Sequence, residues 1–371
     1  MAMKDSLGVG VIGAGFMGET YACAVSTQVE HAHLVAVTGG SRGPALAEKY
    51  GAAAEDSVDT LVARADVDVV CIATPHACHG PEGVAAAMAG KHLLIDKPMA
   101  TTLEDCDAIL AACEDNQLRC ELMYTQRNRI CNRSMKALLD SGELGRVLHM
   151  HNMQVVPDGM KTTPKWQLQA ENVGILLGHG IHNLDQPRWL LNQDIAKVFG
   201  KVSCADPACA VDGTSSLTLT MEDGTIWSMN ICWSLPKVWP GSVYGLEIGI
   251  VGTKGVLDIE DTHRDVILAT ELPQGPGYNP DGLKMEVERN VDFLTSFPPG
   301  DMYEGDLWGP LREETNSWFR RIYLDKATPH ATAAEGHRNL VLTMAMDLSA
   351  KRKAEVELPI TPDELMAGLE A

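Results

Sequence analysis

The sequence predicts an α/β protein in two parts: an N-terminal doubly wound parallel sheet, and a C-terminal α/β domain with an open-faced, largely antiparallel sheet. The first third of the chain alternates apolar, strand-like runs with helical patterns, which is typical of a parallel sheet with helices on both faces. After about residue 125 the chain contains long alternating runs, as expected for antiparallel strands with one buried face. The length of 371 residues exceeds what one hydrophobic core usually serves. We therefore expect two domains, residues 1–125 and residues 126–371.

The first strand-to-helix turn carries the most informative motif. Residues 9–18 read VGVIGAGFMG, an apolar strand followed by G-x-G-x-x-G, and residues 19–28 continue as a helix. Gly13 permits a tight turn, Gly15 leaves room for a pyrophosphate, and Gly18 lets the helix pack on the strand. The helix N-terminus favours phosphates, so this context predicts a Rossmann-type dinucleotide site rather than a glycine-rich turn of another α/β protein. The predicted cofactor residues of this turn are Gly13, Gly15, Phe16, Met17 and Gly18.

The rest of the first part continues the same alternation. Further strands are predicted at residues 34–38, 67–74, 92–95 and 120–125, with helices at residues 83–89 and 103–113. Ligands of such sheets lie beyond the carboxyl ends of the strands, so the segments that follow each strand are candidate site segments.

The end of the second predicted strand indicates which dinucleotide binds. An acidic residue there usually accepts the ribose hydroxyls of NAD, whereas an arginine accommodates the extra phosphate of NADP. Residues 37–42 read VTGGSR, without an acid. Ser41 and Arg42 therefore favour NADP, with NAD as the alternative cofactor. The other interpretation of Arg42 is a solvated arginine in a polar loop.

Two other segments follow predicted parallel strands. One reads ATPHACH over residues 73–79, and the other reads IDKP over residues 95–98. Burial after a strand lowers the pKa of a lysine and suits Lys97 to stabilise an alkoxide, although a lysine in such a loop is also an ordinary surface group. The predicted cofactor residues of these segments are Thr74, Pro75, His76, His79, Asp96 and Lys97.

The second part is predicted to be mainly sheet. Helices are expected at residues 134–139 and 182–191, and strands at residues 147–155, 215–221, 225–233, 245–252 and 256–260. The Asp-Gly pair at residues 223–224 lies between two alternating runs, which is a hairpin signal. Trp227, Trp233 and Trp239 suggest apolar area left for a partner, so we expect a homodimer or homotetramer through this sheet.

The net charge and the hydropathy of the chain limit the classes of molecule that the protein is expected to bind. The formal net charge of −20 repels phosphates, which excludes general affinity for nucleic acid or anionic membrane. No apolar run approaches the ~20 residues of a membrane span, and the N-terminus lacks a signal-peptide pattern. We therefore expect a cytoplasmic protein whose partners are small molecules and copies of itself.

The ten cysteines do not form a metal-binding pattern. Cys71 and Cys78 are seven residues apart, as are Cys106, Cys113 and Cys120, and no C-x-x-C occurs. On helical segments a spacing of seven marks one buried face, where free cysteine behaves as a small hydrophobe. We expect free thiols and no metal site.

The order of the motifs resembles the glucose-fructose oxidoreductase / inositol dehydrogenase (Gfo/Idh/MocA) family. The resemblance rests on G-x-G-x-x-G at residues 13–18, T-P-x-x-x-H at 74–79, AGKH at 89–92 leading into DKP at 96–98, GHGIHNLD at 178–185, GTKG at 252–255, and a closing helix through 344–351. It covers nearly the whole chain. It implies a Rossmann domain followed by an α/β domain whose open-faced sheet makes oligomer contacts.

The resemblance also implies reversible alcohol–ketone chemistry with a nicotinamide cofactor. Lys97 matches the lysine of the family's E-K-P motif, with Asp96 in place of glutamate, and His182 matches the histidine at the catalytic centre. In oxidation, His182 takes the hydroxyl proton and Lys97 stabilises the developing alkoxide. Asp185, three residues after His182, can orient the imidazole. Without the resemblance, His182 also fits a helix-terminal histidine with a structural hydrogen bond.

One departure from the family pattern lies four residues before His182. Many sugar dehydrogenases of the family carry aspartate there, whereas this chain has Gly178, followed by His179. We expect His179 either to replace the missing carboxylate or to contact the substrate.

The resemblance makes a cyclic polyol, a sugar or a sugar derivative the expected substrate. The alternatives are a carboxylated carbocyclic dihydrodiol, glycoside cleavage through transient oxidation by bound NAD, and a dinucleotide sensor without chemistry. Arg127 and Lys165 suit a carboxylate, although each is also an ordinary surface cation. Trp166 is expected to wall the cofactor cleft, or else to be a core residue. The predicted substrate residues are Tyr124, Arg127, Lys165, Asn172, His179 and Asp185.

Overall fold

The computed structural model describes residues 5–157, 180–203, 213–235, 245–260, 267–274, 289–293, 301–303 and 306–370. By its contacts the chain divides into two compact units: unit 1 is Met1–Asn128 with Pro299–Leu340, and unit 2 is Arg129–Pro298 with Val341–Ala371. The expected division into two continuous domains differs from this grouping, because residues 299–340 group with unit 1. Contacts distant in sequence cause the difference: helix α9 (Pro310–Tyr323) packs on α1 (Phe16–Thr27) and on the 3-10 turn η3 (Thr125–Asn128), and strand β17 (Ala331–Thr332) pairs with β6 (Cys120–Met123).

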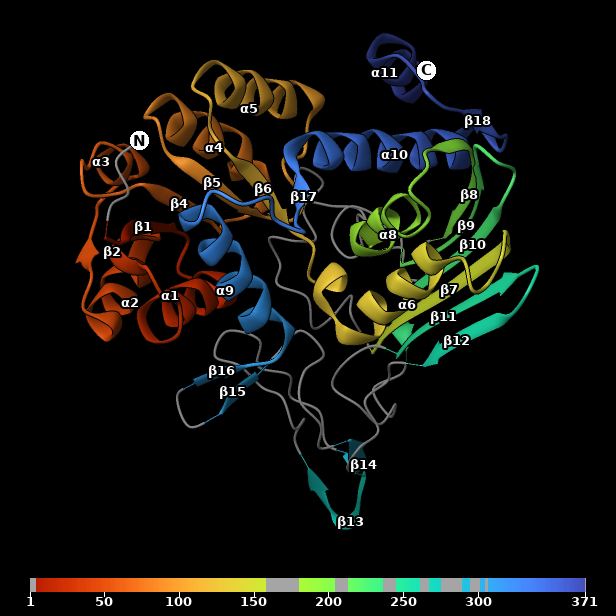
Figure 1. Ribbon diagram of the computed structural model, residues 1–371, viewed down its shortest axis with the longest axis horizontal. Coiled ribbons are helices and arrows are strands. Elements are labelled where there is room, and N and C mark those ends of the chain that lie inside the picture. Colours follow the sequence, from red (N-terminus) through yellow and green to blue (C-terminus); the bar gives the residue numbers. More distant parts are fainter. Residues whose placement is uncertain are drawn as a thin grey trace. The chain divides into compact units, whose positions relative to one another are not determined.

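Unit 1 is built on a seven-stranded sheet, sheet A, with strand order β17-β6-β5-β4-β1-β2-β3 (Figure 1). All neighbouring strands are parallel except β17, which pairs antiparallel with β6. The strands are β1 (Leu7–Ile12), β2 (Ala32–Thr38), β3 (Ala53–Ala54), β4 (Val69–Ile72), β5 (His92–Asp96), β6 (Cys120–Met123) and β17 (Ala331–Thr332). The chain moves outward from the centre in both directions, so the strand order reverses between β1 and β4. This confirms the predicted doubly wound sheet and places its switch point there.

The helices of unit 1 cover both faces of sheet A. Helices α4 and α5 pack together on one face, and α1, α2 and α9 lie on the other (Figure 1). The helices and 3-10 turns are α1 (Phe16–Thr27), η1 (Gly40–Arg42), α2 (Gly43–Tyr50), α3 (Val58–Val62), η2 (His76–Cys78), α4 (His79–Met88), α5 (Leu103–Asp115), η3 (Thr125–Asn128) and α9 (Pro310–Tyr323). Strand β4 is buried along its whole length, as expected for a parallel strand between two helical layers. A short antiparallel pair, β15 (Asp301–Tyr303) and β16 (Asp306–Trp308), precedes α9.

Unit 2 contains a second seven-stranded sheet, sheet B, with order β12-β11-β7-β10-β9-β8-β18. Its neighbours are antiparallel except for β7 and β10, which are parallel, so the prediction of a largely antiparallel sheet is confirmed. The turn at residues 222–224 joins β9 to β10 as the predicted hairpin. The strands are β7 (Val147–Pro157), β8 (Ile195–Ser203), β9 (Thr214–Met221), β10 (Ile226–Leu235), β11 (Gly245–Gly252), β12 (Val256–Glu260) and β18 (Val356–Glu357), and a separate pair is formed by β13 (Ile267–Gln274) and β14 (Arg289–Phe293).

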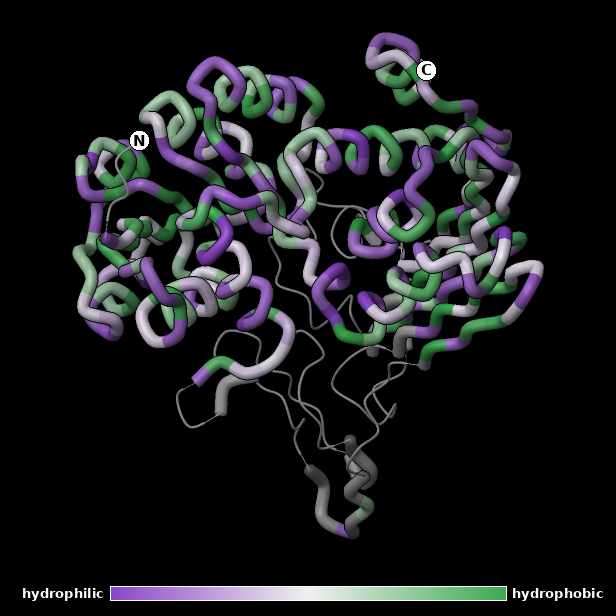
Figure 2. Tube along the Cα trace, in the orientation of Figure 1, coloured by the Kyte–Doolittle hydropathy of each residue, from purple (hydrophilic) through white to green (hydrophobic). Residues whose placement is uncertain are grey.

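Helices pack on one face of sheet B. Asn183 of α8 (Ile181–Leu191) donates to Gln154 of β7, and Gly200 of β8 donates to Ser349 of α10 (Ala333–Arg352). Helix α6 (Ile130–Ser141) packs against α8, and α11 (Pro362–Glu370) ends the described chain. Hydrophobic and hydrophilic residues are mixed along these strands, as expected when the described helices cover one face of the sheet (Figure 2).

The tryptophans do not lie where the sequence analysis expected them. Trp227 is 0% exposed, and its indole N–H donates to Oδ1 of Asn152 over 3.0 Å, so it belongs to the covered face. The expectation that Trp227 offers apolar area to a partner is therefore wrong, because alternation along β10 turns it inward. The side chain of Trp233, and Trp239, lie outside the described residues.

The cysteine spacing has two different causes. Cys106 and Cys113 lie on the buried face of α5, as expected. Cys71 and Cys120 instead lie in strands β4 and β6, where a spacing of seven does not define a helix face. Every cysteine whose side chain is described is a free thiol. In the described part of the chain, no helix is long and apolar enough to cross a membrane.

Candidate functional site

The glycine-rich turn after β1 requires glycine at two positions for steric reasons. Gly13 has a φ of 109° and donates its N–H to the carbonyl of Thr38 over 2.8 Å. A Cβ on Gly18 would lie 1.9 Å from the carbonyl oxygen of Gly13. The turn at Gly13 and helix α1 therefore pack so closely that only glycine fits at these two positions, as the motif predicts.

Gly15 is different, because the described residues leave space beside its backbone. Within 4 Å of the position of a Cβ on Gly15, the nearest atom is Nη2 of Arg42, at 3.8 Å. Helix α1 begins at Phe16, and none of the side chains that the structure describes caps its N-terminus. Open space beside the backbone and uncapped N–H groups fit the diphosphate of a dinucleotide.

Ser41 and Arg42 lie in η1, directly after β2, and both are exposed. The end of β2 lies close to the glycine-rich turn, since a Cβ on Gly39 would be 2.5 Å from Cβ of Ala14. Arg42 makes no salt bridge or hydrogen bond with any other described residue. Its charge is therefore available beside the turn.

The segment after β4 places Thr74 between two partners. Its hydroxyl donates to Oε2 of Glu82, in α4, and its carbonyl oxygen lies 2.9 Å from Nε2 of His79. Burial raises the pKa of Glu82 to about 7, while the hydrogen bond from Thr74 acts in the opposite direction. Pro75 is exposed and His76 is buried.

The predicted cofactor residue His79 is interior. It is 0% exposed, and its ring lies between two backbone carbonyls, with Nδ1 2.7 Å from the oxygen of Pro98. The ring centroid of His76 lies 5.8 Å away. Any effect of His79 on a cofactor must therefore pass through the segments that it holds.

Lys97 and Asp96 follow β5. The Asp96 carboxylate accepts the backbone N–H of Lys97 over 2.9 Å, and the Lys97–Pro98 peptide bond is cis. Burial lowers the pKa of Lys97, and the neighbouring Asp96 opposes this change. Burial raises the pKa of Asp96, whereas Lys97 and His79 lower it. A lysine with a lowered pKa is suited to exchange a proton with an alcohol oxygen.

Three of these segments share one edge of sheet A. Strands β1, β4 and β5 are parallel neighbours, and Ala73 donates to the carbonyl of Ile12 over 2.8 Å where β4 and β1 end. Gly13, Thr74 and Lys97 each follow one of these strands. The structure thus brings together at the carboxyl edge the groups that the motifs predicted from separate stretches of sequence.

Tyr124 and Arg127 follow β6 and are both buried. Arg127 is 5% exposed, and its Nη2 lies 2.9 Å from Oε1 of Glu335. The surface-cation interpretation of Arg127 is therefore wrong: its charge is paired inside unit 1.

In unit 2, helix α8 carries the second predicted group. His182, in its first turn, is half-buried, and Asp185, one turn later, is buried. Between them, Asn183 donates to Oε1 of Gln154 over 2.6 Å.

The sequence analysis did not name several buried polar residues of this unit, among them Gln154 and Gln186. Gln154 lies on β7 and Gln186 on α8, and no hydrogen-bond partner of the Gln186 carboxamide is found among the described residues. The signal for Gln154 was present, because residues 150, 152 and 154 alternate as the covered positions of β7 and two of them are polar.

Other predicted residues cannot be placed. Those outside the described residues are Lys165, Trp166, Asn172, Gly178 and His179.

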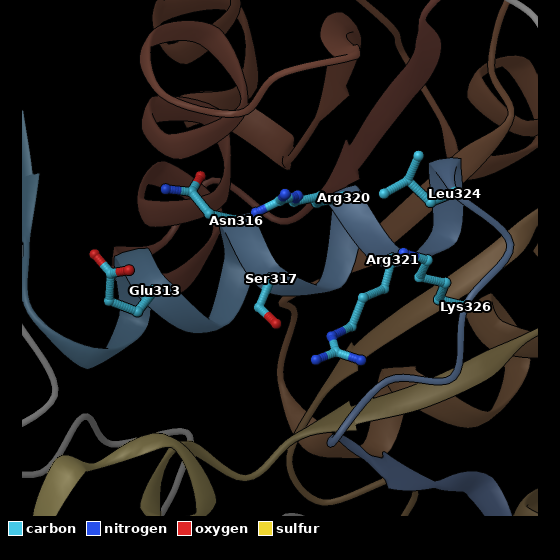
Figure 3. Close-up of a pocket in the computed structure, with 7 residues that line it drawn as sticks. All are labelled: Glu313, Asn316, Ser317, Arg320, Arg321, Leu324 and Lys326. Atoms are coloured by element: carbon cyan, nitrogen blue, oxygen red, sulfur yellow. The ribbon is translucent and has the colours of Figure 1, made fainter.

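A hollow on the exposed face of α9 involves none of the predicted residues. It is lined by Glu313, Asn316, Ser317, Arg320, Arg321, Leu324 and Lys326 (Figure 3). The side chains of Arg320 and Arg321 extend in different directions rather than converging (Figure 3). We assign this hollow no part in the candidate site.

Comparison with known protein families accounts for most of the chain. Residues 7–124 match the oxidoreductase family with an NAD-binding Rossmann fold, GFO_IDH_MocA, and residues 132–258 match a GFO/IDH/MocA C-terminal domain. The first match includes the six parallel strands of sheet A, and the second includes strands β7 to β11 of sheet B and most of β12.

Individual relatives are more distant. A 2,7-anhydro-N-acetylneuraminate hydratase of Mediterraneibacter gnavus is 27% identical over 69% of this chain and 67% of its own length. An inositol 2-dehydrogenase of Saccharopolyspora erythraea is 29% identical over 61% of this chain and 66% of its own. The chain thus aligns with about two thirds of these curated relatives.

The fold is also found in solved structures. A scyllo-inositol dehydrogenase from Lactobacillus casei, solved with bound NAD(H) and scyllo-inositol, has a TM-score of 0.73 and 22% identity, over 95% of this chain and 99% of that one. At this identity the similarity concerns the fold alone.

Proposed function

Since the chain belongs to the GFO/IDH/MocA family of oxidoreductases, with an NAD-binding Rossmann domain, we propose that it transfers a hydride between a nicotinamide dinucleotide and a secondary alcohol or ketone of a cyclic polyol, sugar or sugar derivative. The observation that carries this proposal is the position of Lys97. It follows β5 at the same edge of sheet A as the glycine-rich turn, and burial lowers its pKa. A similar inositol 2-dehydrogenase supports a cyclic polyol as the substrate.

The roles of the protein groups follow from their chemistry. The bound nicotinamide supplies the hydride acceptor in the oxidative direction. Lys97 stabilises the developing alkoxide, and His182 takes the hydroxyl proton. Asp185 follows His182 by one turn of α8 and orients it. Lys97 lies in unit 1 and His182 lies in unit 2.

NADP is the proposed preferred cofactor. Arg42 has no charged partner among the described residues and lies beside the glycine-rich turn, and no acid follows β2 to repel a 2′-phosphate. A planar guanidinium binds phosphate bidentately, which supports the assignment.

We also propose self-association through the open face of sheet B, in a cytoplasmic protein. Large apolar side chains are exposed on the strands of this sheet, which is uncommon for a surface that stays in water. Those at the open-face positions are Met153, Ile226, Val251 and Val256.

A screen of cyclic polyols and sugars with both oxidised cofactors tests the function. We expect the absorbance of reduced nicotinamide to rise with at least one polyol. If the protein binds cofactor but no polyol or sugar reduces it, the proposed reaction is wrong.

A second candidate function is favoured by the similarity to a hydratase. In that case a tightly held NAD would accept a hydride from the substrate and return it within the same turnover, so that the oxidised cofactor would be regenerated. Purified protein would then retain its dinucleotide and convert a glycoside or anhydrosugar without net reduction. Carboxylated dihydrodiols belong in the same screen as an alternative substrate class, whereas a sensor would bind dinucleotide and convert nothing.

A further inference from the structure

One buried side chain links the segments that follow β4 and β5. Nδ1 of His79 lies 2.7 Å from the carbonyl oxygen of Pro98, and Nε2 lies 2.9 Å from that of Thr74. Thr74 follows β4 and Pro98 follows β5, and these strands are parallel neighbours. The histidine itself begins α4 and is fully buried.

The two carbonyls determine how the ring can bond. A carbonyl oxygen only accepts hydrogen bonds, so the ring nitrogen facing it must carry a hydrogen. A neutral imidazole has one N–H and donates to one carbonyl, whereas the protonated ring donates to both. Burial lowers the pKa of His79, although the two carbonyls and Asp96 oppose this change. The shorter distance assigns the hydrogen of the neutral ring to Nδ1, facing Pro98.

The bond to Pro98 bears directly on the neighbouring lysine. The backbone N–H of Lys97 is held by Asp96, and the carbonyl of the next residue is held by His79. The residues that follow, Met99 and Ala100, are buried. Hydrogen bonds thus hold the backbone on both sides of Lys97. They fix the point from which the side chain with its ammonium group extends.

We propose that His79 is a positioning residue for Lys97: its Nδ1–H holds the Pro98 carbonyl and thereby fixes where the Lys97 ammonium lies. This inference rests on the proposed role of Lys97. The positioning of Lys97 by His79 matters for the rate, because displacing a catalytic group by about 1 Å can lower the rate about 100-fold.

Substitution of His79 by either of two amide side chains tests its two hydrogen bonds separately. The nitrogen of Asn can take the place of Nδ1, and that of Gln the place of Nε2. His79→Asn can keep the bond to Pro98, whereas His79→Gln can keep only the bond to Thr74. We expect His79→Asn to retain kcat within about 3-fold, and His79→Gln to lose about 10-fold or more, with the Kd of reduced cofactor unchanged in both.

His92→Asn is the matched control. His92 begins the same strand, β5, and its Nδ1 accepts the N–H of Arg119 at the opposite edge of the sheet. This variant should leave kcat unchanged. A kcat retained by His79→Gln but lost by His79→Asn would contradict the assignment to Pro98.

A measurement independent of turnover separates this inference from the proposed function. Methylation of the lysines with ¹³C gives each lysine an NMR signal, and the Lys97 signal is identified by its absence in Lys97→Arg. The pKa of Lys97 read from this signal should be the same in the wild type and in His79→Asn. In His79→Gln it should move toward the ordinary lysine pKa of about 10.4. An unchanged Lys97 titration in His79→Gln would overturn the positioning role, even if no polyol is ever found to react.

A second test uses the wild-type protein and therefore does not depend on whether the His79 variants fold. The ¹⁵N spectrum of the His79 ring at neutral pH should show a hydrogen on Nδ1. A ring that carries its hydrogen on Nε2 alone would show that Pro98 is not held, and the inference would be wrong.

Discussion

Nη2 of Arg42 lies 3.8 Å from the position that a Cβ on Gly15 would occupy. The side chain that follows β2 therefore reaches the turn that follows β1, where the diphosphate of a dinucleotide is expected. In the described part of the chain this guanidinium has no partner, so it can bind the cofactor and also discriminate NADP from NAD.

Arg42→Ala should reduce the affinity for NADPH by about 10-fold to 100-fold and leave the affinity for NADH nearly unchanged, because a charge-assisted hydrogen bond contributes about 1.5–3 kcal/mol. Calorimetric titration with both cofactors measures this. Lys49→Ala is the control, since Lys49 is a nearby cation already paired with Glu19. Tighter binding of NADH than NADPH by the wild type would contradict the NADP proposal.

Lys97→Met should lower kcat by about 100-fold or more, because the charge that stabilises the alkoxide is lost. Cofactor affinity and the thermal midpoint should change little. Lys326→Met, at an exposed lysine near the end of α9, serves as the control. Near-normal turnover of Lys97→Met would remove Lys97 from the mechanism.

Substitution of His182, within α8, and of His179, which precedes it in the sequence, should change the kinetics in different ways. His182→Asn should lower kcat by about 100-fold because the proton acceptor is lost, whereas His179→Asn should mainly raise KM. Steady-state kinetics on the polyol found in the screen decides between them. Activity that survives without His182 but not without His179 would show that the base is the other histidine.

Glu82 should make the stability of the fold depend on pH. Burial raises its pKa from the usual 4.5 to about 7, so the folded protein holds this proton more tightly than the unfolded chain. The free energy of unfolding should therefore fall as the pH rises from about 4.5 to about 7, by at most about 3 kcal/mol. Glu82→Gln should abolish this decrease, measured by urea unfolding at pH 5 and pH 8.

Glu335 provides a control of opposite sign. Although burial alone raises the pKa of Glu335, the guanidinium of Arg127 lowers it below its usual value. Glu335→Gln should destabilise the protein at neutral pH, and the loss should shrink as the pH falls. A decrease in stability toward pH 8 that persists in Glu82→Gln would assign the effect to another group.

Self-association should depend on the open face of sheet B. Val251 is 39% exposed and pairs across the sheet with Val256 and His149. Val251→Glu should shift the particle toward the monomer mass of 40.1 kDa in light scattering, because a buried interface excludes an unpaired carboxylate. Leu324→Glu, at an exposed apolar residue of unit 1, should not. A wild type that scatters as a 40.1 kDa particle at micromolar concentration would contradict the proposal.

The sequence by itself determined the features that depend on neighbouring residues. The apolar run before Gly13, the glycine spacing to Gly18 and the Asp-Gly turn at residues 223–224 act over a few residues, so the first parallel strand, its turn and the hairpin of sheet B follow from local pattern. The predicted strand at residues 92–95 ends within one residue of the end of β5, so the place of Lys97 follows as well, whereas β4 ends at Ile72, two residues before the predicted end.

Only the tertiary structure decided how distant residues meet. Arg127 pairs with Glu335, 208 residues later, and the inward position of Trp227 depends on which face of β10 the helices cover. His79 reaches Pro98 because α4 packs beside β5. Such contacts depend on packing between elements far apart in the chain, which periodicity and motif spacing do not specify.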